Sequence, residues 1–507
     1  MLRRVKIENG IVEGLPAADP RITSFKGIPF AAPPVGENRW RAPQPAKNWD
    51  GVYKAYAFAP ISMQATPGLN KNDIYTREWM VDPEIPMSED CLYLNVWTPA
   101  KSPDEKLPVF VWFFGGGLQV GHTAEMEFDG ERIARRGIVV VTVNYRLNVF
   151  GFLCHPEITA ESPDAPANFG NLDQQFGIRW VKRNIAAFGG DPDNITIGGQ
   201  SAGGGSVMSQ LTSPQNEEGL FQRAIIQSGI ASRVYPGGRF PGYRRTLEEA
   251  EQEGVKFFEF LGVSSLAEAR KLDAFYLRDK ALEYKGFWGT VQDNAFCVGD
   301  AFKRVVENKR LNVPILFGHT SSEFFAVPQV KTLDEFKALA EELYGGDAGE
   351  FLSLCGYESG NLDEILKKAS VNSIEYAIRV VGQANADTGA NTPLYYYNFD
   401  AEIPGWDNPG TFHSVDLWFF FETLAKCWRP FVGKHYDLAR QMCNYWANFI
   451  RSGDPNGVDS TGEEMPHWYP YTPEKPYGKA FRDKPQFVRE EPSEIMKFLV
   501  RQYFKKK

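Results

Sequence analysis

The sequence has few cysteines and few histidines for its length. Six of its 507 residues are histidine and six are cysteine, the latter at Cys91, Cys154, Cys297, Cys355, Cys427 and Cys443. No two cysteines form a CxxC pair and none lies in a cluster with histidine, which excludes the usual thiol-based metal and redox motifs. In a chain of this size we expect buried, free thiols.

The sequence also lacks an excess of basic residues and a long apolar segment. Lys and Arg number 55 against 64 Asp and Glu, and a net charge of −9 argues against nucleic acid or an anionic membrane as a partner. No apolar run reaches the roughly 18 residues of a membrane helix. The first residues, MLRRVKIENGIVEG, contain no apolar core of a signal peptide. We therefore expect a cytoplasmic protein that acts on a small molecule.

Several short runs are rich in Val, Ile and aromatic residues, as buried strands are. They cover residues 107–114, 138–145, 194–199, 224–229, 313–318 and 393–399. Between the second and third, a helix is predicted that is capped by Asn171 and ends at Gly189 and Gly190. Apolar strands that alternate with helices predict the α/β class, with a mostly parallel sheet covered on both faces.

Residues near 240–290 and 330–390 are charged and have a helical pattern. No Gly/Ser-rich or Pro-rich linker separates them from the rest, and no internal repeat is present. We interpret residues 1–507 as one domain, in which these segments are helical insertions over the C-terminal edge of the sheet.

The segment GGQSAGGGS, residues 198–206, surrounds one serine with glycines. Ser201 lies in a G-x-S-x-G sequence between a predicted strand and a predicted helix, the pattern of a nucleophile elbow. The turn strains the serine backbone, and glycine two residues before and after avoids a collision with the neighbouring strand and helix. A plain glycine-rich turn is the alternative. A phosphate loop is disfavoured because no Lys-Ser/Thr follows the glycines.

A nucleophilic serine also requires an oxyanion hole. Three glycines, Gly115–Gly117, follow the strand at 107–114, and their backbone N–H groups can point at a ligand. Together with the N–H of Ala202, this loop predicts two or three donors, with Phe114 where related loops often have histidine. A simple turn at the end of the strand is the alternative.

The general base should follow the serine and the acid along the chain, because that is the order in α/β hydrolases. This order disfavours His122, His155 and His319. His413 lies in a loop after the strand at 393–399, where a base can lean over the sheet edge, whereas His435 is expected on a helix and His467 in a late loop.

A serine and its base usually act with a third group, an acid that orients the base. This acid should follow a strand that lies between the serine and the base in the sequence. Glu323 lies five residues beyond Gly318, on the loop that leaves a buried strand, and a carboxylate there can orient the imidazole. Asp300 and Asp416 are alternatives with weaker placement.

The sequence resembles the type-B carboxylesterase and cholinesterase family of α/β hydrolases over almost its whole length. The similar segments include FKGIPFAAPPVGENRWRAPQP, SEDCLYLNVWTP, WFFGGGLQVG, VTVNYRLNVFGFL, NFGNLDQQFGIRWVKRNIAAFGGDPDNITIGGQSAGG and GTFHSVDLWFFF. The resemblance implies that Ser201 is the nucleophile, His413 the base and Glu323 the acid. It also implies an oxyanion hole made by Gly116, Gly117 and Ala202, and a contact of Ser228 with the acid.

The sequence departs from this family at three places. Gln200 stands where the family usually has glutamate before the nucleophile, which weakens the case for a cationic substrate. Ser62 stands where secreted members have the cysteine that pairs with that of SEDC, so Cys91 is expected to be unpaired. Trp79 lies in the loop that carries the choline-binding tryptophan of cholinesterases, but out of register with it.

We therefore predict a serine carboxylic-ester hydrolase that acts through an acyl-enzyme on small or aromatic esters, with no metal or organic cofactor. An amidase, lactonase or carbamate hydrolase would use the same groups, and a non-catalytic binding protein would be expected to lose the nucleophile. Besides Gln200, we expect Phe287 and Trp288 to contact substrate if they line the acyl pocket, although such aromatic residues more often belong to the core.

Overall fold

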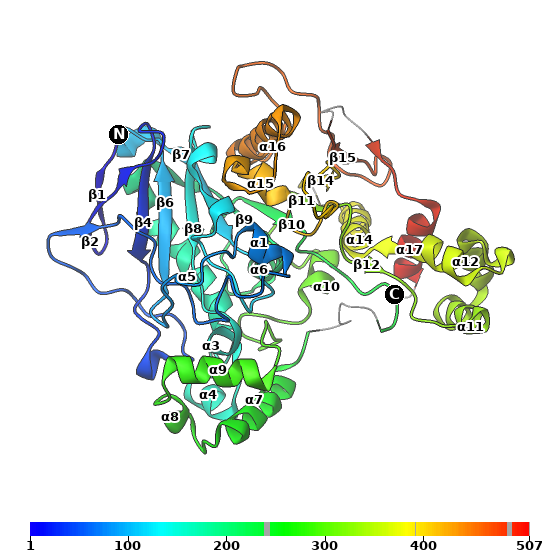
Figure 1. Ribbon diagram of the computed structural model, residues 1–507, viewed down its shortest axis with the longest axis horizontal. Helices are drawn as coiled ribbons and strands as arrows, with labels where there is room; N and C mark the ends of the chain where they lie inside the picture. Colours follow the sequence, from blue (N-terminus) through cyan, green and yellow to red (C-terminus); the bar gives the residue numbers. More distant parts are fainter. Residues whose placement is uncertain (238–243, 391, 484–488, 506–507) are drawn as a thin grey trace.

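The large central sheet organises the molecule. The structure is a computed structural model that describes residues 1–237, 244–390, 392–483 and 489–505 (Figure 1). The sheet has eleven strands in the spatial order β16 (Arg489–Glu490), β15 (Gly478–Phe481), β14 (Leu394–Phe399), β11 (Ile315–Thr320), β10 (Arg223–Gln227), β9 (Gly190–Gln200), β7 (Leu107–Phe113), β8 (Val139–Val143), β6 (Tyr93–Thr98), β4 (Thr23–Pro29) and β3 (Leu15–Pro16).

The strands from β15 to β8 in that order are parallel, and those at both ends are antiparallel. The six strands predicted from the sequence are β7, β8, β9, β10, β11 and β14, which confirms the α/β class with a mostly parallel sheet. Two small sheets lie apart: β1 (Arg4–Ile7), β2 (Gly10–Glu13) and β5 (Val52–Lys54) form one, and β12 (Phe325–Ala326) and β13 (Val371–Asn372) form the other.

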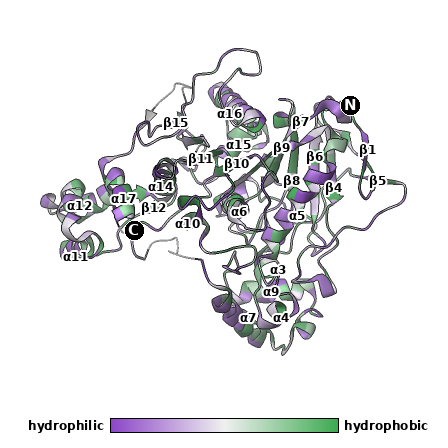
Figure 2. Ribbon diagram, turned by 180° about the vertical axis from the view of Figure 1, so that it is seen from behind, coloured by the Kyte–Doolittle hydropathy of each residue, from purple (hydrophilic) through white to green (hydrophobic). Residues whose placement is uncertain are grey.

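Helices flank the sheet and carry the longer connections (Figure 1). They are α1 (Ile74–Glu78), α2 (Glu131–Ala134), α3 (Asn148–Phe152), α4 (Pro156–Glu161), α5 (Phe169–Asn184), α6 (Ala202–Thr212), α7 (Leu247–Leu261), α8 (Leu266–Ala269), α9 (Ala274–Tyr284), α10 (Ala301–Val306), α11 (Leu333–Tyr344), α12 (Ala348–Cys355), α13 (Leu362–Ala369), α14 (Ser373–Asp387), α15 (Asp416–Phe420), α16 (Gly433–Ser452) and α17 (Glu494–Lys505). The outer helices α7, α11 and α12 carry both hydrophilic and hydrophobic residues, as helices with one face on a core do (Figure 2).

The predicted cap of the long helix α5 is wrong by three residues. The helix begins at Phe169 after Asn168, whose backbone is left-handed with φ of 58°. Asn171 lies inside the helix and is buried, because its side chain bonds to Gln174 and Thr290 rather than to the helix end. Gly189, with φ of 81°, follows the last helical turn as predicted.

Helices α7–α9 and α11–α14 fall within the two segments predicted to be helical. In Figure 1, α7–α9 lie beside α3 and α4 at one end of the molecule, and α11, α12 and α17 lie at another. Helices α7–α9 share with α3 and α4 a hydrophobic cluster that is separate from the main core.

All six cysteines are free, and five of them are buried. Within the described residues, no helix combines the length and apolarity needed to cross a membrane.

Candidate active site

Ser201 occupies a strained turn between β9 and α6. Its backbone has φ of 56° and ψ of −123°, outside the regions that serine ordinarily adopts. Its N–H donates to the carbonyl of Gln227 on the neighbouring strand, at 2.8 Å, which holds the turn in place. A Cβ on Gly203 would lie 2.1 Å from the carbonyl oxygen of Phe113, and one on Gly199 would lie 2.4 Å from the Gly203 carbonyl. Glycine is therefore required on both sides of the serine.

Three side chains from distant parts of the chain meet at this turn. The Nε2 of His413 lies 2.8 Å from the Oγ of Ser201, and its Nδ1 contacts the Oε2 of Glu323. Glu323 follows β11 and His413 follows β14, so the C-terminal ends of three parallel strands supply the groups. The arrangement is that of a serine nucleophile, a base and an orienting acid.

The carboxylate of Glu323 is buried and fully bonded. Its Oε1 accepts hydrogen bonds from the hydroxyl of Ser228 at 2.5 Å and from the backbone N–H of Thr320 at 2.7 Å. Burial alone would raise the pKa of Glu323, but His413 and these donors outweigh it and hold the pKa below its usual value. The acid is therefore ionised where it contacts the imidazole.

Gln200 and Phe324 fix the other sides of the imidazole. The side-chain amide of Gln200 lies 3.3 Å from Nε2 of His413 and donates to Oγ of Ser414 at 2.6 Å. The Phe324 ring lies 4.4 Å from the imidazole, centroid to centroid. Gln200 also lines the cavity in front of Ser201, so it lies where both the base and a substrate can touch it.

The other acids and histidines considered from the sequence lie elsewhere or have other partners. Asp300 caps α10 through the N–H of Lys303. Asp416 is buried and accepts from the hydroxyl of Tyr397 at 2.7 Å; burial raises its pKa to about 6. His435 accepts from the N–H of Val432 at the start of α16.

His122, which chain order disfavours as the base, is buried. Its backbone N–H donates to Glu125, and burial lowers its side-chain pKa to about 4.

The triple-glycine loop faces the same cavity as Ser201. Gly116 and Gly117 have φ of 104° and 64°, values that favour glycine. Among the described residues, no backbone carbonyl accepts a hydrogen bond from the N–H of Gly116 or Gly117. Ala202 begins α6, where N–H groups have no acceptor within the helix. All three donors can therefore serve a ligand oxygen.

The cavity in front of Ser201 has a volume of about 290 Å³. Besides the glycine loop and Gln200, its walls come from α1 and its flanks, the segment 120–128 and the residues around His413. They are Asp73, Tyr75, Trp79, Met80, Val120, Glu125, Glu127, Phe128, Phe324, Ser414 and Leu417.

Neither Phe287 nor Trp288 is among the residues that line this cavity. Phe287 is 65% exposed, and Trp288 is buried against Phe257 and Tyr284 in the cluster of α7–α9.

Sequence reasoning missed Tyr75 and two acids in this wall, Glu125 and Glu127. The run AEMEFDGE reads as a solvated loop, because nothing in its local pattern reveals that both glutamates are buried. Their position in the sequence could have revealed them. The run follows the triple glycine, and residues that come soon after an oxyanion loop in the sequence remain near the nucleophile in space.

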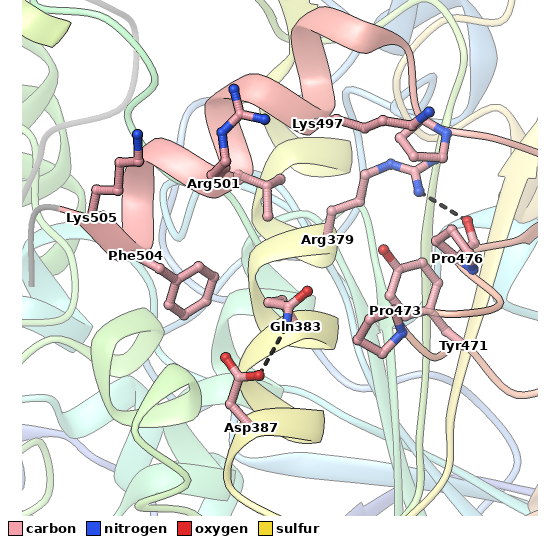
Figure 3. A pocket seen from close by; sticks show the side chains of 12 residues that line it. Arg379, Gln383, Asp387, Tyr471, Pro473, Pro476, Lys497, Arg501, Phe504 and Lys505 are labelled. Carbon is pink, nitrogen blue, oxygen red and sulfur yellow. Dashed lines mark hydrogen bonds between the residues drawn. The ribbon is translucent and has the colours of Figure 1, made fainter. Parts of the chain in front are cut away.

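A second cavity, of about 520 Å³, lies between α14, α17 and the segment 471–476 (Figure 3). Its basic side chains have acidic partners: Arg379 pairs with Glu375, Arg501 with Glu350, Lys505 with Asp347 and Lys497 with Glu494. Among the described residues, no serine, cysteine or histidine lines it, so a serine nucleophile is expected in the first cavity instead. Within the described part of the chain, no group of three or more His, Cys, Asp or Glu residues could hold a metal ion.

Comparisons with known proteins identify the family of the chain. The profile of the carboxylesterase family matches residues 2–345 and 361–496. A para-nitrobenzyl esterase of Bacillus subtilis (strain 168) is 32% identical over 456 residues, 86% of this chain and 87% of that protein. A fumonisin B1 esterase of Sphingopyxis macrogoltabida is 30% identical over 493 residues, 89% of this chain and 82% of that protein.

Solved structures extend the likeness to the whole fold. A PNB esterase has a TM-score of 0.76 and 27% identity, and the match covers 99% of this chain and 100% of that one. A carboxylesterase of Geobacillus stearothermophilus has a TM-score of 0.73 and 30% identity, and the match covers 98% of this chain and 99% of that one. The chain belongs to the carboxylesterase family and is a serine carboxylic-ester hydrolase.

Proposed function

We propose that Ser201, His413 and Glu323 carry out the hydrolysis through an acyl-enzyme. The single observation that supports this most is the 2.8 Å contact between Oγ of Ser201 and Nε2 of His413. His413 takes the hydroxyl proton while Oγ attacks the ester carbonyl and a tetrahedral intermediate forms. The ionised Glu323 stabilises the imidazolium that results.

The N–H groups of Gly116, Gly117 and Ala202 hold the oxyanion of this intermediate in our proposal. Each such donor contributes on the order of 3 kcal/mol to the transition state. The intermediate collapses, the C–O bond to the alcohol breaks, and His413 gives its proton to the leaving oxygen. A water molecule then attacks the acyl-enzyme, with His413 again as base, and releases the acid and free Ser201. No step needs an oxidant, a metal or an organic cofactor.

We further propose that small or aromatic carboxylic esters are the substrates and that the whole chain acts as one catalytic unit. The cavity of about 290 Å³ and the rings of Tyr75, Trp79 and Phe324 in its wall support compact or aromatic groups. The six free thiols support a reducing compartment, the cytoplasm.

A hydrolysis screen beside the Ser201→Ala variant tests the mechanism. The wild type should hydrolyse benzyl acetate and p-nitrophenyl acetate faster than a long-chain ester. Ser201→Ala should lower kcat by at least about a thousandfold, since the triad acts as a unit. A fluorophosphonate probe should form a covalent adduct on Ser201 in the wild type and none in the variant. Full activity in Ser201→Ala would show that another group is the nucleophile.

A further inference from the structure

Two glutamates line the wall of the active-site cavity. Glu125 and Glu127 flank Met126 on the segment that follows the triple glycine, and both contribute to the cavity that contains Ser201 and His413. Glu125 is 6% exposed and Glu127 is fully buried. Acidic side chains are rarely buried to this degree unless something compensates their charge.

The chain itself does not supply that compensation. Glu125 accepts a hydrogen bond from the backbone N–H of His122 at 2.7 Å. Within the described residues, neither carboxylate oxygen of Glu127 has a hydrogen-bond partner. No Lys or Arg of that part of the chain forms an ion pair with either glutamate. Glu125 lies close by, and the like charge of each carboxylate disfavours ionisation of the other. Glu78, a further acid whose charge raises the pKa of Glu127, is already paired with Arg429.

The burial of the two carboxyl groups favours their protonated forms, and a bound cation would favour their ionised forms instead. Burial raises the pKa of Glu125 to about 7, and burial together with Glu125 raises the pKa of Glu127 well above its usual range. A ligand ammonium group carries the positive charge that both carboxylates lack and the N–H donors that the oxygens of Glu127 lack. Its binding would return the pair to its ionised form and satisfy the oxygens of Glu127.

We propose that the Glu125–Glu127 pair binds a protonated amine of the substrate, so that the preferred substrates are carboxylic esters that carry a primary or secondary ammonium group. This inference rests on the proposed function, because the pair lies in the cavity that serves Ser201. The sequence argued against a cationic substrate from Gln200. The pair restores negative charge from a different part of the wall, and the sequence gives no sign that these two glutamates face inward.

Matched esters isolate the ammonium group. 4-(Aminomethyl)benzyl acetate and 4-ethylbenzyl acetate differ only in CH₂NH₃⁺ against CH₂CH₃ on the alcohol side. Methyl 4-(aminomethyl)benzoate and methyl 4-ethylbenzoate make the same comparison on the acyl side. At pH 7 the wild type should prefer the ammonium ester of at least one pair by tenfold or more in kcat/KM.

Variants then assign the preference to the pair. Glu127→Gln and Glu125→Gln should each reduce the preference at least fivefold. Glu131→Gln, a control that replaces a nearby glutamate paired with Arg135, should retain it. No preference in either ester pair would overturn the proposal, as would a preference that survives in both variants.

A binding measurement separates this inference from the hydrolytic mechanism. Calorimetry on the Ser201→Ala protein measures the affinity of 4-(aminomethyl)benzyl acetate and methyl 4-(aminomethyl)benzoate without turnover. At least one ammonium ester should bind tenfold or more tightly than its ethyl partner, and Glu127→Gln in the same background should remove the difference. Equal affinities within both pairs would reject the ammonium site even if the wild type hydrolyses both neutral esters.

Discussion

At the scale of single residues, the proposed catalytic positions could be found from the sequence because the backbone or a neighbouring strand marks each one. Ser201 needs a turn that only flanking glycines permit, and Gly203 lies against the carbonyl of Phe113 with no room for a side chain. Glu323 and His413 each follow a strand that is apolar enough to recognise. Glu125 and Glu127 could not be found in the same way, because their burial results from the packing of segments distant in the sequence.

Gln200 is the residue whose replacement tests the environment of the base. A glutamate there would place a negative charge beside the His413 imidazole, which Gln200 now approaches with a neutral amide at 3.3 Å. The charge favours the imidazolium, the form that cannot accept the Ser201 proton. In Gln200→Glu we expect the acid limb of the kcat/KM profile to move about one pH unit higher.

The control for this test is Gln200→Met, which removes the amide without adding charge. Its kcat should be lower because the hydrogen bond to Ser414 is lost, but its acid limb should coincide with that of the wild type. Equal displacement of the limb in both variants would mean that geometry, and not charge, sets the profile.

At the scale of elements, the short helix α1 is held by a buried ion pair. Glu78 ends the helix, and its carboxylate accepts from the guanidinium of Arg429 and the indoles of Trp418 and Trp428. The side chains of Glu78 and Arg429 are both completely buried. Since five residues cannot form a stable helix alone, this anchor keeps one wall of the active-site cavity in place.

Removal of the Glu78 charge should therefore destabilise the protein. Glu78→Gln leaves Arg429 buried with only Asp407 as a charged partner, and breaking a buried pair costs about 3 kcal/mol. Urea denaturation should show this loss. Glu8→Gln, which breaks the largely exposed pair with Arg183, should cost less than about 1 kcal/mol. Similar losses in the two variants would mean that the pair with Arg429 does not anchor α1.

The buried glutamates on either side of Met126 should make the stability of the protein depend on pH. The pKa of Glu125 is raised from 4.5 to about 7, so between these pH values the folded state binds more protons than the unfolded state. The free energy of unfolding therefore falls as pH rises through this window, by an amount on the order of 3 kcal/mol. Glu127, whose pKa is raised well above its usual range, extends the loss of stability to higher pH.

Glu127→Gln should relieve much of that loss of stability, since the amide can donate to Glu125 and carries no charge. We expect its Tm to exceed that of the wild type more at pH 8 than at pH 5. A Tm difference that is independent of pH would mean that the two carboxyl groups do not interact in the folded protein. If the pair binds substrate as proposed, Glu127→Gln should be more stable than the wild type and should have a weaker preference for ammonium esters.

At the scale of the whole molecule, the sequence predicts six adjacent parallel strands of the sheet, from β14 to β8, but neither β15 nor the antiparallel strands at its ends. The parallel strands are buried on both faces, so their apolar runs stand out. Strands β4 and β6 lie beyond them, and β4 shifts register between Phe25 and Ile28, which interrupts a simple pattern. Local patterns reveal which segments are strands when burial is uniform, and they fail where pairing depends on segments distant in the sequence.

Helices α7–α9 form a part of the molecule that should open before the sheet does. They pack with α3 and α4 on a hydrophobic cluster of their own, separate from the core that contains β7 and β10. Phe260, Phe275 and Leu282 on these helices remain 40–49% exposed, so they contribute less to burial than residues of the sheet. A unit with a smaller separate core opens at a lower free energy than the whole protein.

Hydrogen exchange measured by mass spectrometry tests this difference. Peptides from α7 and α9 should exchange at least tenfold faster than peptides from β7 and β10 under native conditions, because they need only local opening. Peptides from the C-terminal half of α5, where Ile178, Trp180 and Val181 pack on the main core, are the matched control and should exchange as slowly as the sheet. If α7 and α9 were as protected as β7, the two hydrophobic clusters would unfold as one unit, and α7–α9 would be an integral part of the sheet's core.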